Sequence, residues 1–115
     1  MKFGHIELFV SNPFRSQKFY CEILDFEVIA NQNNDLIWIK KDNIEILLRP
    51  GSTTRAPSYQ DANHAIVWYT DDLSKTTKEL RKKGLEFQGF DDSPKCLTFT
   101  DPDGHWFQLV NPEDH

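Results

Sequence analysis

Cysteine, long hydrophobic runs and clusters of basic residues are all scarce in this sequence. Its 115 residues include only two cysteines, Cys21 and Cys96, which lie far apart and outside any metal or redox motif. We therefore expect buried, reduced thiols and no disulfide. The N-terminus lacks the apolar stretch of a signal peptide, and no run approaches the ~20 apolar residues of a membrane span. These absences predict a soluble, cytoplasmic protein with no membrane partner.

Positive charge is also limited, because 13 Lys and Arg stand against 18 Asp and Glu, for a formal net charge of −5. The largest basic cluster, Arg81 to Lys83, ends an expected helix, where cations complement the helix dipole. Proteins that bind nucleic acid need a basic footprint, so we expect no nucleic-acid partner. Aromatic residues, in contrast, are plentiful. We expect some of the nine Phe, three Trp and three Tyr to line a cavity for a ligand with apolar surface.

The chain reads as two similar copies. Strand-like runs begin at His5 and at His64, and each is followed by a helix-like stretch and three further strand-like segments. Copy one is expected to have strands at 4–10, 26–30, 36–41 and 44–49 and a helix at 13–24. Copy two is expected to have strands at 63–70, 85–90, 95–100 and 105–111 and a helix at 71–84. Each copy therefore has the order β-α-β-β-β.

A copy of this size is too small to bury a sheet face alone, so we interpret the two copies as halves of one domain. The predicted α+β domain spans 1–115, with module one at 1–50, a polar linker at 51–62 and module two at 63–115. The linker contains glycine and proline, and it either lies ordered over a pocket or merely connects the modules.

Local signals mark the ends of both helices. Asn12 or Ser11 is expected to cap the first helix ahead of Pro13, and Gly84 to end the second in a left-handed conformation. Each helix also has a less polar stripe expected to face a sheet. These stripes comprise Phe14, Phe19, Tyr20, Ile23 and Phe26 in the first and Leu73, Thr76, Thr77 and Leu80 in the second.

Four polar residues occupy comparable places in the two copies: His5 and Glu45 in the first, His64 and Gln108 in the second. Side chains alternate along a strand, so His5 is expected to share a face with Glu7, away from the apolar layer. Two imidazoles, a carboxylate and an amide oxygen suit a divalent ion such as Zn, Ni, Mn, Co or Fe. The alternative is a polar pocket without a metal.

Several longer segments carry a resemblance to a known family. The segments GHIELFV, FRSQKFYCEILDFEV, NHAIVWYTDDL and DPDGHWFQLVNP resemble the glyoxalase/bleomycin-resistance/dioxygenase family, also called the vicinal oxygen chelate superfamily. The resemblance covers nearly the whole chain. It implies paired βαβββ modules forming one incomplete-barrel pocket for a metal or ligand, often in a homodimer.

The resemblance also implies roles for the four polar residues. His5, Glu45, His64 and Gln108 fall on the metal-ligand positions of glyoxalase I-like members, with Glu45 as the catalytic base. Gln108 departs from the family, which usually has Glu there. An amide coordinates through its carbonyl oxygen but cannot act as a carboxylate base, so weaker metal binding is expected.

Three functions remain open on these residues. The first is a metal-assisted lyase or isomerase that acts on a substrate with vicinal oxygens. The second is a metal-free protein that sequesters an aromatic or amphipathic compound. The third, an extradiol dioxygenase or fosfomycin-type thiol transferase, fits less well because Gln108 replaces a carboxylate. The side chains expected to contact the small molecule are Phe9, Trp38, Arg49, Trp68, Phe99 and Trp106.

Overall fold

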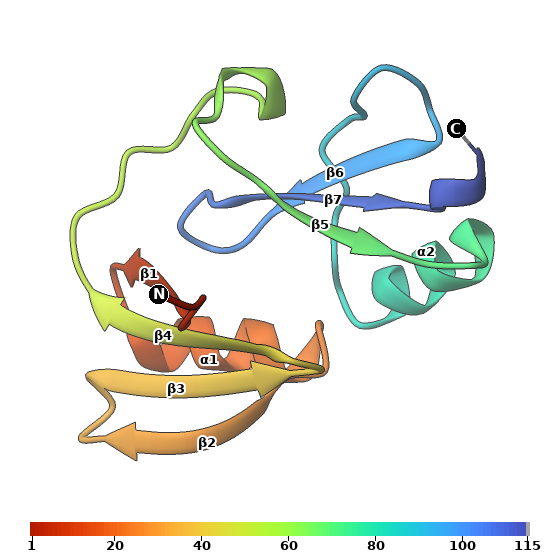
Figure 1. The fold of residues 1–115 in the computed structure, drawn as a ribbon. Helices are drawn as coiled ribbons and strands as arrows, with labels where there is room; N and C mark the ends of the chain where they lie inside the picture. The colour runs from red at the N-terminus through yellow and green to blue at the C-terminus, as the bar shows by residue number, and fades with distance from the viewer. Residues whose placement is uncertain (115) are drawn as a thin grey trace. The chain divides into compact units, whose positions relative to one another are not determined.

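The elements of the computed structural model follow one another in two series, separated near residue 54 (Figure 1). The structure describes residues 1–114, and its two compact units are Met1–Thr54, termed unit 1, and Arg55–His115, termed unit 2. Unit 1 contains β1 (Ile6–Val10), α1 (Pro13–Glu22), β2 (Glu27–Gln32), β3 (Leu36–Lys41) and β4 (Ile44–Pro50). Unit 2 contains the short 3-10 helix η1 (Tyr59–Asp61), β5 (Ile66–Tyr69), α2 (Leu73–Lys82), β6 (Cys96–Thr100), β7 (Trp106–Val110) and the 3-10 helix η2 (Pro112–Asp114).

The α+β class and the glyoxalase-type fold predicted from the sequence are confirmed, with two small mixed sheets that do not close. Neither α-helix, nor any other helix among residues 1–114, is long and apolar enough for a transmembrane span.

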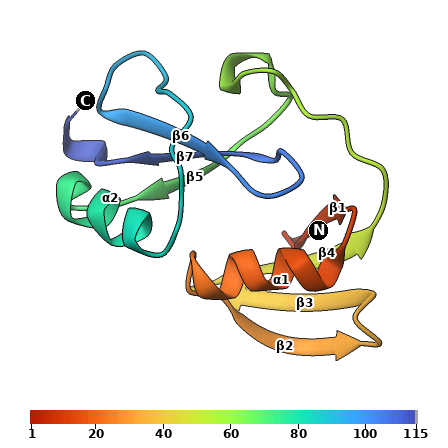
Figure 2. The same ribbon diagram turned by 180° about the vertical axis from the view of Figure 1, so that it is seen from behind.

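Unit 1 is a four-stranded sheet in the order β1-β4-β3-β2, with α1 on one face (Figure 2). Strands β1 and β4 are parallel, and β3 is antiparallel to both of its neighbours. The residues that face α1 are almost fully buried, as period-two alternation requires. They are Leu8, Val10, Ile37, Ile39, Ile46 and Leu48.

Helix α1 begins at the expected cap, since the Asn12 side chain accepts a hydrogen bond from the Arg15 backbone N–H at 3.1 Å. Tyr20 is fully buried, but Phe14 is 44% exposed. The expected stripe was therefore wrong at Phe14, because the buried side of α1 runs through Ser16 and Tyr20, one turn apart.

Unit 2 is a three-stranded sheet in the order β5-β7-β6, with β5 parallel and β6 antiparallel to β7. Asp72 caps α2 by accepting a hydrogen bond from the Lys75 backbone N–H at 3.0 Å. Gly84 follows the helix with φ of 103°, which confirms the predicted left-handed ending. Thr77 is the buried member of the predicted stripe on α2.

The strand predicted at 85–90 does not form. Only Phe90 is bridged to the sheet, through Leu97. Gly89 has φ of 94°, a left-handed conformation that interrupts the ladder, although Gln88 and Gly89 still exchange backbone hydrogen bonds with Thr98.

Candidate functional site

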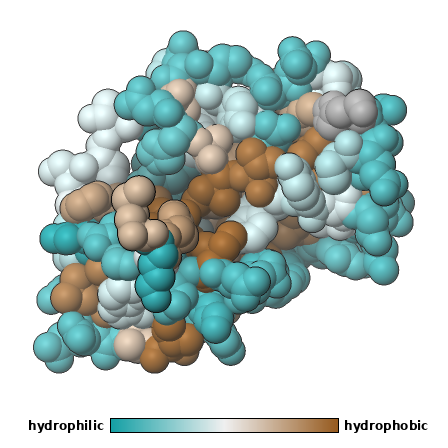
Figure 3. Space-filling view, in the orientation of Figure 1, coloured by the Kyte–Doolittle hydropathy of each residue, from teal (hydrophilic) through white to brown (hydrophobic). Residues whose placement is uncertain are grey.

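The face of the unit 1 sheet that points away from α1, here called the helix-free face, combines charged and aromatic side chains. The strand registers place Glu7 opposite Leu47 and Phe9 opposite Arg49, with Trp38 also opposite Leu47. Hydrophobic and hydrophilic residues are interspersed on the surface seen from this side (Figure 3). Ordinary soluble sheets also expose polar residues on one face, so the contacts between these side chains are more informative than their polarity.

His5, Glu7 and Arg49 form a connected polar group on this face. One carboxylate oxygen of Glu7 lies 2.8 Å from Nε2 of His5, and the other accepts a hydrogen bond from Nη1 of Arg49 at 2.9 Å. The hydrogen bond with His5, followed by that from Arg49, lowers the pKa of Glu7. The carboxylate is therefore fixed in its ionised form between two nitrogen groups.

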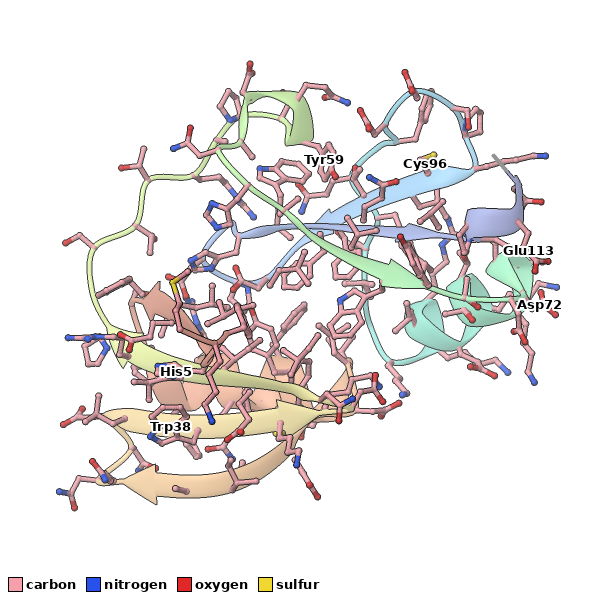
Figure 4. The ribbon with its side chains drawn as sticks, viewed as in Figure 1. His5, Trp38, Tyr59, Asp72, Cys96 and Glu113 are labelled. Carbon is pink, nitrogen blue, oxygen red and sulfur yellow. The ribbon has the colours of Figure 1, made fainter. Side chains whose placement is uncertain are left out.

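Aromatic rings flank this polar group. The His5 ring meets the edge of Trp38 with 4.6 Å between ring centroids (Figure 4), and the Arg49 guanidinium lies 4.9 Å from the centre of the Phe9 ring. Phe9 is 46% exposed. The arrangement offers a flat ligand an aromatic surface next to an oriented cation.

Glu45 lies on the same face, opposite Lys40 of β3. Strands β1 and β4 are parallel and Ile6 is paired with Ile46. His5 and Glu45 each precede a member of this pair by one residue, so they lie next to each other across these two strands of the sheet. The structure thus brings the two predicted ligands of module one to the same edge of one face, as strand alternation predicted.

In unit 2, Gln108 lies between Val67 of β5 and Thr98 of β6. We call this side of the sheet the Gln108 face; alternation also places Trp106 and Tyr69 on it. Phe99 lies on the opposite side, is 1% exposed and stacks on Phe107 with 5.0 Å between centroids. Phe99 therefore belongs to the core, and its predicted contact with a ligand has no support. Trp68 is paired with Leu109, so its side chain also lies on the side of the sheet away from Gln108.

The Arg55–Asp61 segment, most of the expected linker, is ordered on unit 2 by side-chain contacts. Arg55 donates to the Thr100 hydroxyl at 2.7 Å, and the Trp106 indole N–H donates to the Ala56 carbonyl at 3.1 Å. The Gln108 amide donates to the Tyr59 hydroxyl at 2.7 Å. The segment thus covers part of the Gln108 face, and Trp106 is only 6% exposed.

A second polar pair in unit 2 holds the turn between β6 and β7. The buried Asp101 carboxylate accepts hydrogen bonds from the backbone of Asp103 and His105, and its second oxygen lies 2.7 Å from Nδ1 of His105. Burial opposes the charged imidazole, but the hydrogen bond and charge of Asp101, with the charge of Asp103, raise the pKa of His105 overall.

The helix caps show how the two histidines correspond. His5 immediately precedes β1 and lies seven residues before the Asn12 cap. In unit 2, the residue that immediately precedes β5 and lies seven residues before the Asp72 cap is Ala65. His64 is one residue earlier in the chain. The sequence correspondence between His5 and His64 is therefore displaced by one position, which matters because successive side chains alternate faces.

The strand registers also show that the residue of unit 1 that corresponds to Gln108 is not Glu45. Gln108 is paired with Val67, two residues beyond Ala65, and Leu47 is paired with Glu7, two residues beyond His5. Leu47 therefore corresponds to Gln108, whereas Glu45 corresponds to Trp106.

These placements bear on how well the four predicted ligands suit a metal. The structure brings His5 and Glu45 together, but Nε2 of His5 is hydrogen-bonded to Glu7; the Gln108 amide nitrogen donates to Tyr59, which leaves its carbonyl oxygen available. His64 lies one residue before the position in unit 2 that corresponds to His5. Within either unit, among residues 1–114, no three His, Cys, Asp or Glu side chains gather as a metal-holding group. In unit 1, His5 would have to exchange its contact with Glu7 for a metal, and in unit 2 His64 is displaced by that one residue.

Two contributors, Glu7 and Tyr59, are absent from the site predicted by sequence. Glu7 shares its strand face with His5, so alternation alone was a usable signal. Tyr59 lies in a polar segment with no periodic pattern, and nothing in the sequence connects it with Gln108.

The chain is similar to known proteins along most of its length. A family model described as Glyoxalase/Bleomycin resistance protein/Dioxygenase superfamily matches residues 2–109. A manganese-dependent 2,3-dihydroxybiphenyl 1,2-dioxygenase from Geobacillus genomosp. 3 is 27% identical over 94% of this chain. The chain spans only 36% of that curated relative.

Solved structures with this fold belong to proteins with different functions. A lactoylglutathione lyase from Agrobacterium tumefaciens has a TM-score of 0.71 at 14% identity, covering 97% of this chain and 94% of that one. The fosfomycin resistance protein FosX from Mesorhizobium loti has a TM-score of 0.74 at 17% identity, covering 95% and 90%. An antibiotic-binding protein from Streptomyces sp. CB03234 has a TM-score of 0.66 at 23% identity, covering 97% and 98%. At these identities the likeness establishes the fold alone.

Proposed function

Because this chain belongs to the Glyoxalase/Bleomycin resistance protein/Dioxygenase superfamily, we propose that it binds a small organic molecule on the helix-free face of unit 1 without a metal. The observation that carries this proposal is the group of Trp38, Phe9 and Arg49 around the His5–Glu7 pair. Aromatic surface beside oriented polar groups is the usual composition of a small-molecule site.

The class of ligand follows from the way Glu7 and Phe9 orient the Arg49 guanidinium. Glu7 fixes one side of the Arg49 guanidinium, and Phe9 supports its plane. An oriented guanidinium binds planar acceptors well, because its donors form a rigid fork. We therefore expect an aromatic or amphipathic compound with an acceptor group. The antibiotic-binding protein with this fold is an example of such a role.

The test is a titration calorimetry panel of aromatic compounds with and without acceptor groups. Phe9→Ala is expected to weaken binding about tenfold, since it removes both ring contact and the support of Arg49. Phe14→Ala is the matched control, because Phe14 is similarly exposed in the same unit but belongs to α1. Equal effects of the two substitutions, or no binding by any compound, would refute the proposal.

The second candidate is metal-assisted lyase or isomerase chemistry on a substrate with vicinal oxygens. It is favoured by the adjacency of His5 and Glu45 on one face and by the similarity to a manganese-dependent dioxygenase. In that case the ligands would be His5, Glu45, His64 and Gln108, with Glu45 as the base. This set has less support than the aromatic group, because Nε2 of His5 already contacts Glu7 and His64 is displaced by one residue from the place that corresponds to His5.

Metal content of protein purified without chelator separates the two candidates. The lyase requires about one equivalent of metal in the wild type and its loss in both His5→Ala and His64→Ala. The double variant Ala65→His/Gln108→Glu is the complementary test, because it puts a histidine and a carboxylate on the Gln108 face. The binding proposal expects no stoichiometric metal in the wild type.

A homodimer and a cytoplasmic location also remain proposals. Light scattering after size exclusion would test the first, with a dimer giving twice the mass of the chain. Fractionation of the source cells would test the second.

A further inference from the structure

The Arg55–Asp61 segment places a phenol beside Gln108, on the central strand of the Gln108 face. The Gln108 amide nitrogen lies 2.7 Å from the Tyr59 hydroxyl, and both residues are half-buried. The Tyr59 ring meets Trp106 edge-on, with 6.2 Å between centroids. Figure 4 shows Tyr59 at the start of η1, beside the strands of unit 2.

Several contacts hold this pair in place. Arg55 and Ala56 anchor the start of the segment to Thr100 and Trp106, and Gln60 anchors its end through Asp91 at 3.0 Å. The hydrogen bond between Tyr59 and Gln108 is therefore one of several, so its loss alone should leave the segment attached. Attachment of the segment to the sheet therefore does not depend on the bond between Tyr59 and Gln108.

The hydrogen-bonding inventory of the pair is incomplete. An amide group has two N–H donors and two carbonyl acceptor sites, and a phenol has one donor and acceptor capacity. When Gln108 donates one N–H to Tyr59, the phenol proton, the second amide N–H and the amide oxygen remain for other partners. If the amide is turned over, the phenol donates to its oxygen, and both amide N–H groups and the phenol oxygen remain. Either orientation offers at least one donor and one acceptor.

We propose that Tyr59 and Gln108 form a subsite for a neutral group that has a donor and an acceptor side by side, such as a carboxamide or lactam. The inference rests on the proposed function only in that the protein binds a small molecule. Both partners are uncharged, so the subsite favours a two-point neutral match over an anion.

The experiment uses two probes of similar size, naphthalene-2-carboxamide and 2-acetylnaphthalene, in calorimetric titrations. The ketone keeps the acceptor and lacks the donor. Wild-type protein is expected to bind the carboxamide about five- to tenfold more tightly, the effect of one additional hydrogen bond. Tyr59→Phe and Gln108→Met are each expected to reduce this ratio to about one.

Tyr69→Phe is the matched control, because Tyr69 lies on the same face but is 73% exposed. It should keep the wild-type ratio, and circular dichroism should show all three variants folded. A ratio near one in the wild type, or an unchanged ratio in either Tyr59→Phe or Gln108→Met, overturns the subsite.

The same titrations distinguish this inference from the proposed function. If the carboxamide preference persists while Phe9→Ala has no effect, the subsite stands and the site on unit 1 fails. If Phe9→Ala weakens both probes equally while Tyr59→Phe changes nothing, the site on unit 1 stands and the subsite fails. If neither probe binds, both are refuted.

Discussion

Units 1 and 2 repeat the same early topology, a strand followed by a capped helix, yet their sheet faces have diverged. On unit 1, His5 immediately precedes the first strand and contacts Trp38 and Glu7. On unit 2, Ala65 occupies that place, and the Gln108 face is partly covered by the Arg55–Asp61 segment. The difference teaches that buried alternation and helix caps preserve the fold, whereas single exposed positions decide the chemistry.

The units also differ in how far their paired carboxylates are exposed to solvent. Glu7 of unit 1 is ionised at the surface between two nitrogen groups, whereas Asp101 of unit 2 is 2% exposed and satisfied by the turn that it closes. The first network is partly exposed to solvent, and the second stabilises a turn. Four predictions test this contrast, beginning with the core of unit 2.

Phe107→Ala is expected to have the largest effect, a loss of about 3–5 kcal/mol in the free energy of unfolding. Phe107 is fully buried and stacks on Phe99, so truncation leaves a cavity. Urea unfolding followed by circular dichroism measures the loss. Phe90→Ala is the control, since Phe90 is 53% exposed; a similar loss in both variants would contradict the assignment of Phe107 to the core.

Asp101→Asn is expected to lower the free energy of unfolding by about 2–3 kcal/mol, because it weakens charge-assisted hydrogen bonds to a buried acceptor. The pH dependence should also change. The folded-state pKa of His105 is raised above its ordinary value of 6.5, so its contribution is complete below that value and is lost as the pH rises through the folded pKa.

Urea titrations across this range should show the alkaline loss in the wild type and a flatter profile in Asp101→Asn. His105→Gln provides the matched control, because it removes the titrating group and keeps the carboxylate. An unchanged pH slope in both variants would show that the pair does not govern stability in this range.

Gly104→Ala is expected to cost about 1–2 kcal/mol, and more than Gly84→Ala. Both glycines have positive φ, of 89° and 103°, so both substitutions introduce backbone strain. A Cβ at Gly104 would also lie 2.8 Å from Cγ of Arg55, whereas a Cβ at Gly84 meets nothing within 4 Å. Thermal unfolding of the two variants measures the difference, and an equal loss would argue against close packing of Arg55 on this turn.

Glu7→Gln is expected to have the smallest effect on stability, because the ion pairs of Glu7 are exposed to solvent. The folded-state pKa of Glu7 is lowered from 4.5, so its contribution is present above that value and is lost as the pH falls through the folded pKa. The variant should therefore lack this acid-side decline in melting temperature. Glu27→Gln, on the exposed strand β2, is the control.

Local signals in the sequence predicted much of the fold. Asn12 and Gly84 mark helix ends through contacts within a few residues, and alternating apolar residues identify β1, β3 and β4. The strand expected at 85–90 failed because period-two alternation in LEFQGF does not reveal that Gly89 adopts a left-handed conformation. Long-range pairing decides such conformations, and composition does not encode it.

The candidate site was less predictable for a specific reason. The second helix is preceded by two aspartates, Asp71 and Asp72, and either is a good cap. His64 lies seven residues before Asp71, so a cap at Asp71 would make it the counterpart of His5. The structure uses Asp72, which transfers that place to Ala65. A choice between identical neighbours thus determines which side chain occupies a key position.

The Arg55–Asp61 segment is attached to its sheet through Arg55, Trp106, Gln108 and Gln60 side chains, and it adds no strand to the sheet. Replacing such residues alters what lies over Gln108 without removing any hydrogen bond between strands. The cover and the scaffold therefore depend on different contacts: side-chain hydrogen bonds hold the segment, and backbone hydrogen bonds hold the strands together.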